Sequence, residues 1–221
     1  SIQTRRFGPE DGFPDEPCNA LECDARGRIW AGLQFGGVAV WNGEAWKAYD
    51  CLTGPLSGRV FAIRTNPATE DVWIATDAGI SVWHDADGAW SHLSRQDGLP
   101  EDQVNAVAFR RDGEAVLAMQ STGLVFVSLR RAQDGRRAVR IRNVRAPAEA
   151  RPIPPSDRGQ GLPSDLVNDV LVVRGDSAIV AAPTAGLAWS KDVGTSVLRI
   201  GGVGRARTGE PLGRPAPAAG A

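Results

Sequence analysis

Hydrophobic residues along this chain fall into short runs separated by turn-forming residues. Some runs alternate apolar with polar positions, as at Val104, Ala106 and Ala108, which is typical of a strand with one buried face. Others are continuous, as over 72–75 and 178–181, which is typical of a strand buried on both faces. Turn residues lie between the two kinds of run. The pattern therefore predicts consecutive short antiparallel strands and no long helix.

Two landmarks divide these strands into four units. The first is a turn-like tripeptide of glycine, proline and an apolar residue, and the second is a glycine followed by an aliphatic residue. Both recur at spacings of 42, 44 and 63 residues. The two sets of glycines are Gly12, Gly54, Gly98 and Gly161, and Gly37, Gly79, Gly123 and Gly186. A period of about 40 to 50 residues that holds several short strands is the signature of β-propeller blades.

The fold predicted is therefore all-β: a β-propeller with four recognisable four-stranded antiparallel blades that form part of a larger ring. The units start near residues 11, 53, 97 and 160 and occupy residues 1–200. The third unit has a longer stretch rich in arginine and proline, which predicts a surface insertion at about 130–159. Residues 201–221 are rich in glycine and proline and predict a flexible tail or linker.

Tryptophans recur at matching places in these units. Trp30, Trp73, Leu117 and Val180 are predicted to be equivalent middle-strand positions and to be largely buried. Because an indole can bury roughly 150–250 Å² between stacked sheets, the tryptophans are interpreted as packing between blades rather than as ligand-stacking groups.

The ends of the array bear on closure of the ring. Phe7 is spaced from Tyr49 and Leu93 as an outer-strand residue would be, so residues 1–7 predict the outer strand of a blade. Residues 196–200 predict an outer strand for the last unit and compete for the same edge. A larger ring accommodates both, whereas a closed ring of four blades does not.

The string Asp97-Gly98-Leu99-Pro100 followed by 104–107, the segment 161–170, and Val72-Trp73-Ile74-Ala75-Thr76 before Gly79 resemble the two-component-regulator propeller repeat. The second unit departs from that repeat by exchanging leucine and proline, and the third by placing Leu117 at the tryptophan position. The resemblance implies the ligand-sensing β-propeller region of bacterial hybrid sensor proteins, in an extracytoplasmic, periplasmic location. No signal peptide is seen in this segment.

Charge and composition narrow the function classes. The formal net charge is −1, which gives no drive toward nucleic acid. No apolar stretch approaches the ~18 residues of a membrane span. Cys18, Cys23 and Cys51 are too few for a disulfide framework and are interpreted as half-buried thiols, with a link between Cys18 and Cys23 left open.

Candidate chemistry is sparse. His84 and His92 are the only histidines, lack the spacing of metal ligands and are interpreted as surface residues. No catalytic residue, metal site or cofactor is predicted. Acidic and asparagine side chains recur where the chain approaches the first strand of a unit. They either satisfy local backbone groups or ring one mouth of the central channel as ligand-binding residues. The predicted binding residues are Asp15, Asn19, Asp102, Asn105, Asp165 and Asn168.

These observations favour a non-catalytic binding or sensing module. Its predicted partners are a small molecule, glycan or peptide ligand and a partner protein or adjoining blades, with no nucleic acid. The alternatives are a propeller enzyme, such as a lyase or glycan-active hydrolase, and a protein-interaction scaffold.

Overall fold

The structure is a computed structural model that describes residues 4–131, 137–145, 162, 164–176, 178–184, 186–190 and 201–202. Its regular elements are strands, apart from three single turns of 3-10 helix: η1 (Pro9–Asp11), η2 (Arg95–Asp97) and η3 (Arg174–Asp176). None of the helical segments in this part of the chain has the length and apolar character needed to cross a membrane.

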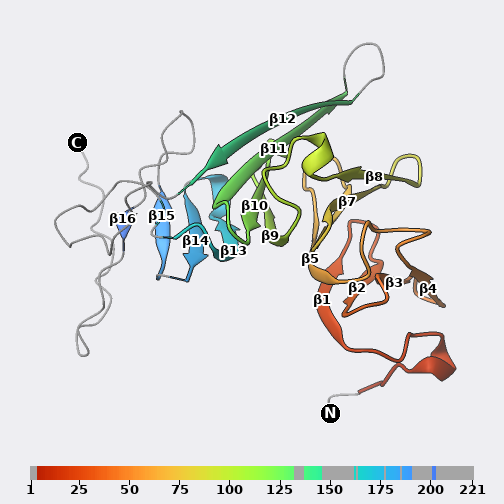
Figure 1. Ribbon diagram of the computed structural model, residues 1–221. Helices are drawn as coiled ribbons and strands as arrows, with labels where there is room; N and C mark the ends of the chain where they lie inside the picture. Colours follow the sequence, from red (N-terminus) through yellow and green to blue (C-terminus); the bar gives the residue numbers. More distant parts are fainter. Residues whose placement is uncertain are drawn as a thin grey trace, which may run out of the picture.

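In the described part of the chain, sixteen strands form four antiparallel sheets, each of four strands in chain order, and we call these sheets blades 1 to 4 (Figure 1). Blade 1 contains β1 (Cys18–Cys23), β2 (Ile29–Leu33), β3 (Val38–Trp41) and β4 (Trp46–Tyr49). Blade 2 contains β5 (Val60–Thr65), β6 (Val72–Thr76), β7 (Gly79–His84) and β8 (Ala89–Leu93). Blade 3 contains β9 (Val104–Phe109), β10 (Ala115–Met119), β11 (Leu124–Arg131) and β12 (Arg137–Val144). Blade 4 contains β13 (Val167–Val172), β14 (Ile179–Pro183), β15 (Ala188–Ser190) and β16 (Gly201–Gly202).

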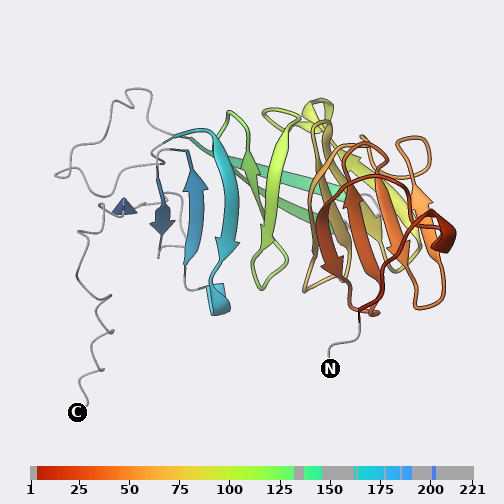
Figure 2. The ribbon, with the colours of Figure 1, turned by 90° about the horizontal axis from the view of Figure 1, so that it is seen from below.

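The blades stand face to face in an open row. The inner strands β1, β5, β9 and β13 contact one another in sequence, and the later strands of each blade lie farther out (Figure 1). Seen from below, the sheets follow one another from the N-terminal to the C-terminal blade without meeting again (Figure 2). The predicted fold class, an all-β propeller of four blades that do not close on themselves, is confirmed.

The second glycine landmark has a steric cause. Gly37 has φ +85°, and a Cβ there would lie 2.2 Å from the Tyr49 carbonyl oxygen. Gly79 has φ +122°, and its Cβ would lie 2.2 Å from the Leu93 carbonyl oxygen. A side chain at either place would combine a left-handed backbone with a collision, so only glycine fits where the third strand begins beside the end of the fourth.

Apolar side chains fill the spaces between successive blades. Between blades 1 and 2, the Trp30 ring centroid lies 6.1 Å from that of Trp83 and 6.3 Å from that of Trp90. Between blades 2 and 3, Trp73 meets Phe109 edge to face at 5.4 Å. The prediction that tryptophans pack between blades is confirmed at both junctions.

One predicted equivalence is wrong by a single residue. In blade 2, Trp73 of β6 pairs with Val82 of β7. Phe126 of β11 is the counterpart of Val82 in blade 3, and it pairs with Val116 and not with Leu117. The reason is that the turn before β10 has one residue fewer than the turn before β6. Because neighbouring residues of a strand point to opposite faces, Leu117 packs toward blade 2 while Val116 packs toward blade 4. Leu117 is buried as predicted, but Val180 is only half-buried.

The chain also differs from the expectations at its N-terminal end. Residues 4–7 form no strand, and Phe7 instead packs its ring against Trp41 and Trp46 of blade 1. Within the predicted insertion at 130–159, β12 pairs with β11 as a hairpin, and residues 146–159 lie outside the described residues. The fourth strand expected over 196–200 lies outside the described residues, and β16 pairs with β15 just beyond it.

Two further features concern exposure. The three cysteines are free and exposed rather than half-buried, and no disulfide joins Cys18 to Cys23. On blade 4, Leu171 and Leu187 are 60% and 47% exposed. In the earlier blades, the residues at the corresponding positions face the next blade. The outward face of the last described blade therefore presents apolar side chains to solvent.

Candidate functional site

The segments that lead into the inner strands, which we call the mouth loops, are residues 13–17, 55–59, 99–103 and 164–166. They are tied to the turns between the second and third strands. Glu16 accepts hydrogen bonds from the backbone N–H groups of Phe35 and Gly36, at 2.8 and 2.9 Å. Glu101 accepts bonds from the backbone N–H and hydroxyl of Ser121, both at 2.7 Å. These two glutamates, which sequence reasoning missed, order the mouth loops.

Two of the predicted binding residues connect neighbouring blades. The Asn19 amide in β1 donates to the Val60 carbonyl of β5 at 3.4 Å. The Asn105 amide in β9 donates to the Val167 carbonyl of β13 at 2.9 Å. Both bonds run from the second residue of one inner strand to the first residue of the next. Phe61 holds the corresponding place in β5, with the Arg59 guanidinium 5.3 Å above its ring.

The other predicted residues have different surroundings. Asp102 accepts a bond from the Arg95 backbone N–H at 2.8 Å, and Asp165 is paired with Arg145 at 3.3 Å. Asp15 is exposed. It is not the counterpart of Asp102, because the next residue, Glu16, holds that place in blade 1. Asn168 is exposed on β13, next to the Val167 carbonyl that Asn105 contacts. The structure thus brings Asn105 near Asn168, while Asn19 lies two inner strands away.

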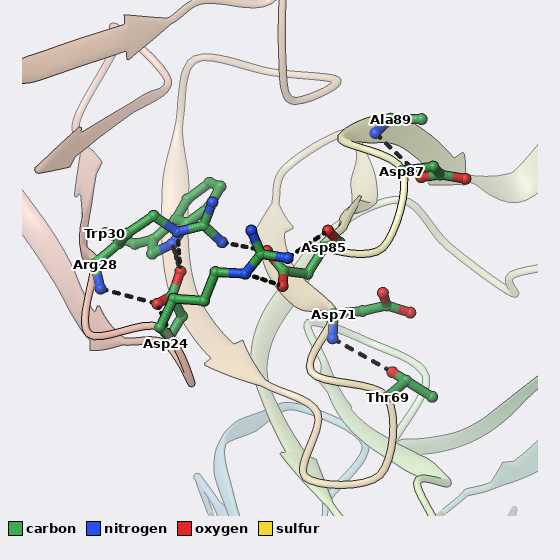
Figure 3. A network of polar contacts seen from close by, with 9 residues as sticks. Asp24, Arg28, Trp30, Thr69, Asp71, Asp85, Asp87 and Ala89 are labelled. Carbon is green, nitrogen blue, oxygen red and sulfur yellow. Dashed lines mark hydrogen bonds and ion pairs between the residues drawn. The ribbon is translucent and has the colours of Figure 1, made fainter. Parts of the chain in front are cut away.

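At the opposite end of the blades, a charged network joins blades 1 and 2 (Figure 3). Asp24, with 6% of its surface exposed, accepts bonds from the Trp30 indole at 2.7 Å and the Arg28 guanidinium at 2.6 Å. Arg28 also bonds Asp85 of blade 2 at 2.6 Å, and Arg26 pairs with the same carboxylate at 2.6 Å. Burial opposes ionisation of Asp24, but the bonds from Trp30 and Arg28 outweigh it and hold the Asp24 pKa below its ordinary value.

The corresponding place between blades 2 and 3 is hollow. A cleft of about 340 Å³ lies there. Its lining residues are Asn66, Thr69, Asp71, Trp73, His84, Ala86, Asp112, Gly113, Glu114, Ser128 and Leu129.

A chain of hydrogen bonds holds one wall of this cleft. His84 Nδ1 lies 3.1 Å from Asp71 Oδ2, and His84 Nε2 lies 2.6 Å from Ser91 Oγ. His84 is 5% exposed, so the expectation of a surface histidine is wrong for this residue, although it holds for the exposed His92. Sequence alone gave no sign of burial, because His84 ends β7 next to a turn.

Trp73, one of the lining residues, is only 1% exposed. Its indole Nε1 is buried and has no hydrogen-bond partner among the described residues. An unsatisfied buried N–H costs about 1–3 kcal/mol. Asn66, the residue in the place of Asp24, turns away from the indole, since its amide donates to the Gly113 carbonyl at 3.0 Å and its oxygen accepts from Ala68 N–H at 2.9 Å.

Carboxylates lie on the other wall. Glu114 accepts a bond from Arg110 at 2.9 Å, lies 3.9 Å from Arg142, and accepts a bond from the Ser128 hydroxyl at 3.3 Å. Within the described part of the chain, no group of three or more His, Cys, Asp or Glu side chains is arranged to hold a metal ion.

No protein-family model matches this chain, and no curated protein matches it in sequence. Its fold is nevertheless similar to solved structures. One is the extracellular domain of BT3049 from B. thetaiotaomicron, assigned to a hybrid two-component system: the TM-score is 0.65 at 14% identity, over 91% of this chain and 26% of that one.

A second is the extracellular domain of BT4673 from the same organism, also assigned to a hybrid two-component system, with a TM-score of 0.61 at 10% identity over 81% of this chain and 22% of that one. A third is an auxiliary nutrient binding protein from Bacteroides ovatus, with a TM-score of 0.55 at 11% identity over 84% of this chain and 46% of that one. The chain spans about a quarter of the length of the first two. At these identities the similarity establishes the propeller fold.

Proposed function

We propose that this chain is a non-catalytic binding module, part of the extracytoplasmic ligand-sensing propeller of a bacterial two-component receptor. The observation that carries the proposal is the shared blade arrangement with extracellular domains assigned to hybrid two-component systems. The resemblance of the repeats to the two-component-regulator propeller family supports the same assignment. A nutrient binding protein with the same fold is a further precedent for ligand binding.

Within this proposal, the mouth loops and the start of the inner strands bind ligand. Asp15 and Asn168 are the most available of the predicted residues, because both are exposed and no side-chain hydrogen bond is recorded for either within the described residues. Asp102, Asn105 and Asp165 are held in place by other groups, and Asn19 spans two blades. These four residues shape the mouth, and Asp15 and Asn168 contact the ligand.

The alternative of a propeller enzyme meets one suggestive arrangement. Asp71, His84 and Ser91 follow the bonding order of a hydrolytic Ser-His-Asp triad. Asp71 and His84 line the cleft, but Ser91, the residue that would attack a substrate, is not among its lining residues. We therefore assign the chain of bonds to fixing the His84 ring rather than to catalysis.

The test is a ligand screen on the 221-residue chain by thermal shift, with sugars, short peptides and amino acids as probes. The expected result is stabilisation by one class, loss of that effect in Asn168→Ala, and recovery of the probe unchanged by mass spectrometry. Glu44→Ala is the control, because Glu44 is exposed at the opposite end of blade 1. Chemical conversion of the probe would instead support the enzyme.

A further inference from the structure

We infer that the cleft between blades 2 and 3 is a second ligand site, which binds the guanidinium group of a small organic cation. Its lining residues come mainly from the turns between the first and second strands and between the third and fourth strands. The cleft therefore lies at the opposite end of the blades from the mouth loops and shares no residue with them.

The first argument is what fills the same place between blades 1 and 2. There the Arg28 guanidinium pairs with Asp24 and with Asp85 at 2.6 Å each, and its central carbon lies 5.7 Å from the centre of the Trp30 ring (Figure 3). Trp30 and Trp73 occupy the same position in their blades. The space beside this tryptophan position therefore accommodates a guanidinium group in the first junction.

The second argument is that the second junction has lost this internal guanidinium. Asp71 stands in the place of Arg28, Asn66 in the place of Asp24, and Leu129 in the place of Asp85. All three replacements line the cleft. Because an aspartate is much shorter than an arginine, a space of about 340 Å³ remains, which is within the range of small-molecule sites.

The third argument is the charge of the lining. Asp71 of blade 2 and Asp112 and Glu114 of blade 3 contribute carboxylates, and none of the described residues that line the cleft is a lysine or arginine. Within the described residues, Asp71 contacts His84 and Asp112 accepts the Glu114 N–H, but neither pairs with a lysine or arginine. Glu114 is paired with Arg110 and contributes less. A cleft lined by charges of one sign concentrates ligands of the opposite sign.

The arrangement favours a guanidinium over a metal ion. In the described part of the chain, no three His, Cys, Asp or Glu side chains are arranged to hold a metal. A guanidinium is planar and carries donors along more than one edge, so it can bond to carboxylates that stand apart on two walls. Asn66 and His84 are already held by bonds within the protein, which reduces the cost of ordering the site when a ligand binds.

The experiment follows the backbone signals of Ala86 and Gly113, two lining residues, in two-dimensional ¹H–¹⁵N spectra of the labelled chain. The probes are arginine and agmatine. Citrulline is the comparison, because it carries a neutral urea group in place of the guanidinium of arginine. Arginine and agmatine are expected to shift both signals saturably, whereas citrulline should not. The affinity for arginine should fall as salt is added, because salt screens the carboxylates.

Two conservative variants test the carboxylates. Asp71→Asn should weaken arginine binding about tenfold, as expected for the loss of one partly buried charged partner. Asp112→Asn should weaken it about threefold, because Asp112 is exposed. Asparagine keeps an oxygen that can accept the Glu114 N–H, so this turn should stay intact. Glu44→Gln is the matched control, because Glu44 is exposed on the equivalent turn of blade 1 and should leave binding unchanged.

A third variant fills the cleft. Asp71→Arg restores the arginine of the first junction, so it should occupy the cleft and abolish the shifts, with thermal unfolding as the check that the variant folds. The inference is overturned if neither arginine nor agmatine shifts the two signals saturably, or if citrulline binds as tightly as arginine. It is also overturned if folded Asp71→Arg binds normally or if Asp112→Asn binds like Glu44→Gln.

The outcome is separable from that of the proposed function. Arginine binding that is retained in Asn168→Ala and lost in Asp71→Arg supports the cleft, whatever the mouth loops bind. Arginine binding that is lost in Asn168→Ala and retained in folded Asp71→Arg would overturn the cleft and leave the proposed function standing.

Discussion

The junction between blades 1 and 2 and the junction between blades 2 and 3 bury a tryptophan at the same position, but they differ in what meets its indole. In the first, Asp24 accepts the indole N–H and is itself held by Arg28, which reaches Asp85 of the next blade. In the second, the charged network is absent and a cleft takes its place. The comparison teaches that the same buried tryptophan position can have its indole N–H bonded to a carboxylate in one junction and without a partner among the described residues in the next.

The largest expected effect tests whether the two tryptophans are structurally equivalent. Trp30→Ala and Trp73→Ala should each lower the free energy of unfolding by about 3–5 kcal/mol, because each removes a fully buried ring between blades. Urea denaturation measures the loss. A Trp73→Ala variant as stable as the wild type would show that the register of blade 2 is misassigned.

The next effect tests the charged network itself. Asp24→Ala should cost about 3 kcal/mol, since it leaves Arg28 with one carboxylate partner fewer and the Trp30 indole without an acceptor. The matched change in the other junction, Asn66→Ala, should cost about 1 kcal/mol, because Asn66 makes only neutral hydrogen bonds. Equal losses in the two variants would remove the distinction between the junctions.

A smaller effect isolates the indole N–H. Trp30→Phe should cost about 1–3 kcal/mol, because the buried Asp24 loses a donor. Apart from the effect of the smaller ring, Trp73→Phe should raise the free energy of unfolding by about 1–3 kcal/mol, since it removes a buried N–H that has no partner among the described residues and breaks no internal bond. Chemical denaturation of both variants gives the difference, and a Trp73→Phe loss as large as that of Trp30→Phe would contradict it.

The smallest effect is on pH dependence. The folded-state pKa of Asp24 is below its unfolded value, so the unfolded chain binds the proton more readily. Its stabilisation is fully present above the unfolded pKa and is lost as the pH falls through the folded pKa. Asp24→Asn should therefore reduce the fall in the free energy of unfolding, the acid limb, that is measured between neutral pH and about pH 2. The exposed Asp11 and Asp50 also have lowered pKa values and leave part of that slope in the variant. An unchanged acid limb would argue against the network.

The sequence predicted the blades well because each unit carries its own strand pattern and turn glycines. The register of blade 3 was missed at Leu117, since one residue fewer in a turn reverses the face of the following strand without altering the apolar pattern. The binding residues at the mouth remain predictions, and Asn19 and Asn105 turned out to bond across blades. The cleft could not be predicted from the sequence of one unit, because it depends on two residues, Asp71 and Leu129, that lie in different blades.

The placement of these contacts also governs how repeats can diverge after duplication. Gly37 and the Tyr49 carbonyl that excludes any side chain there belong to the same unit, so copying a unit transmits the constraint whole. In the Arg28–Asp85 ion pair, each residue belongs to a different unit, so a substitution at either residue removes the pair. Duplicated blades therefore keep the same internal geometry, while the side chains at each junction between blades can differ from those at the next.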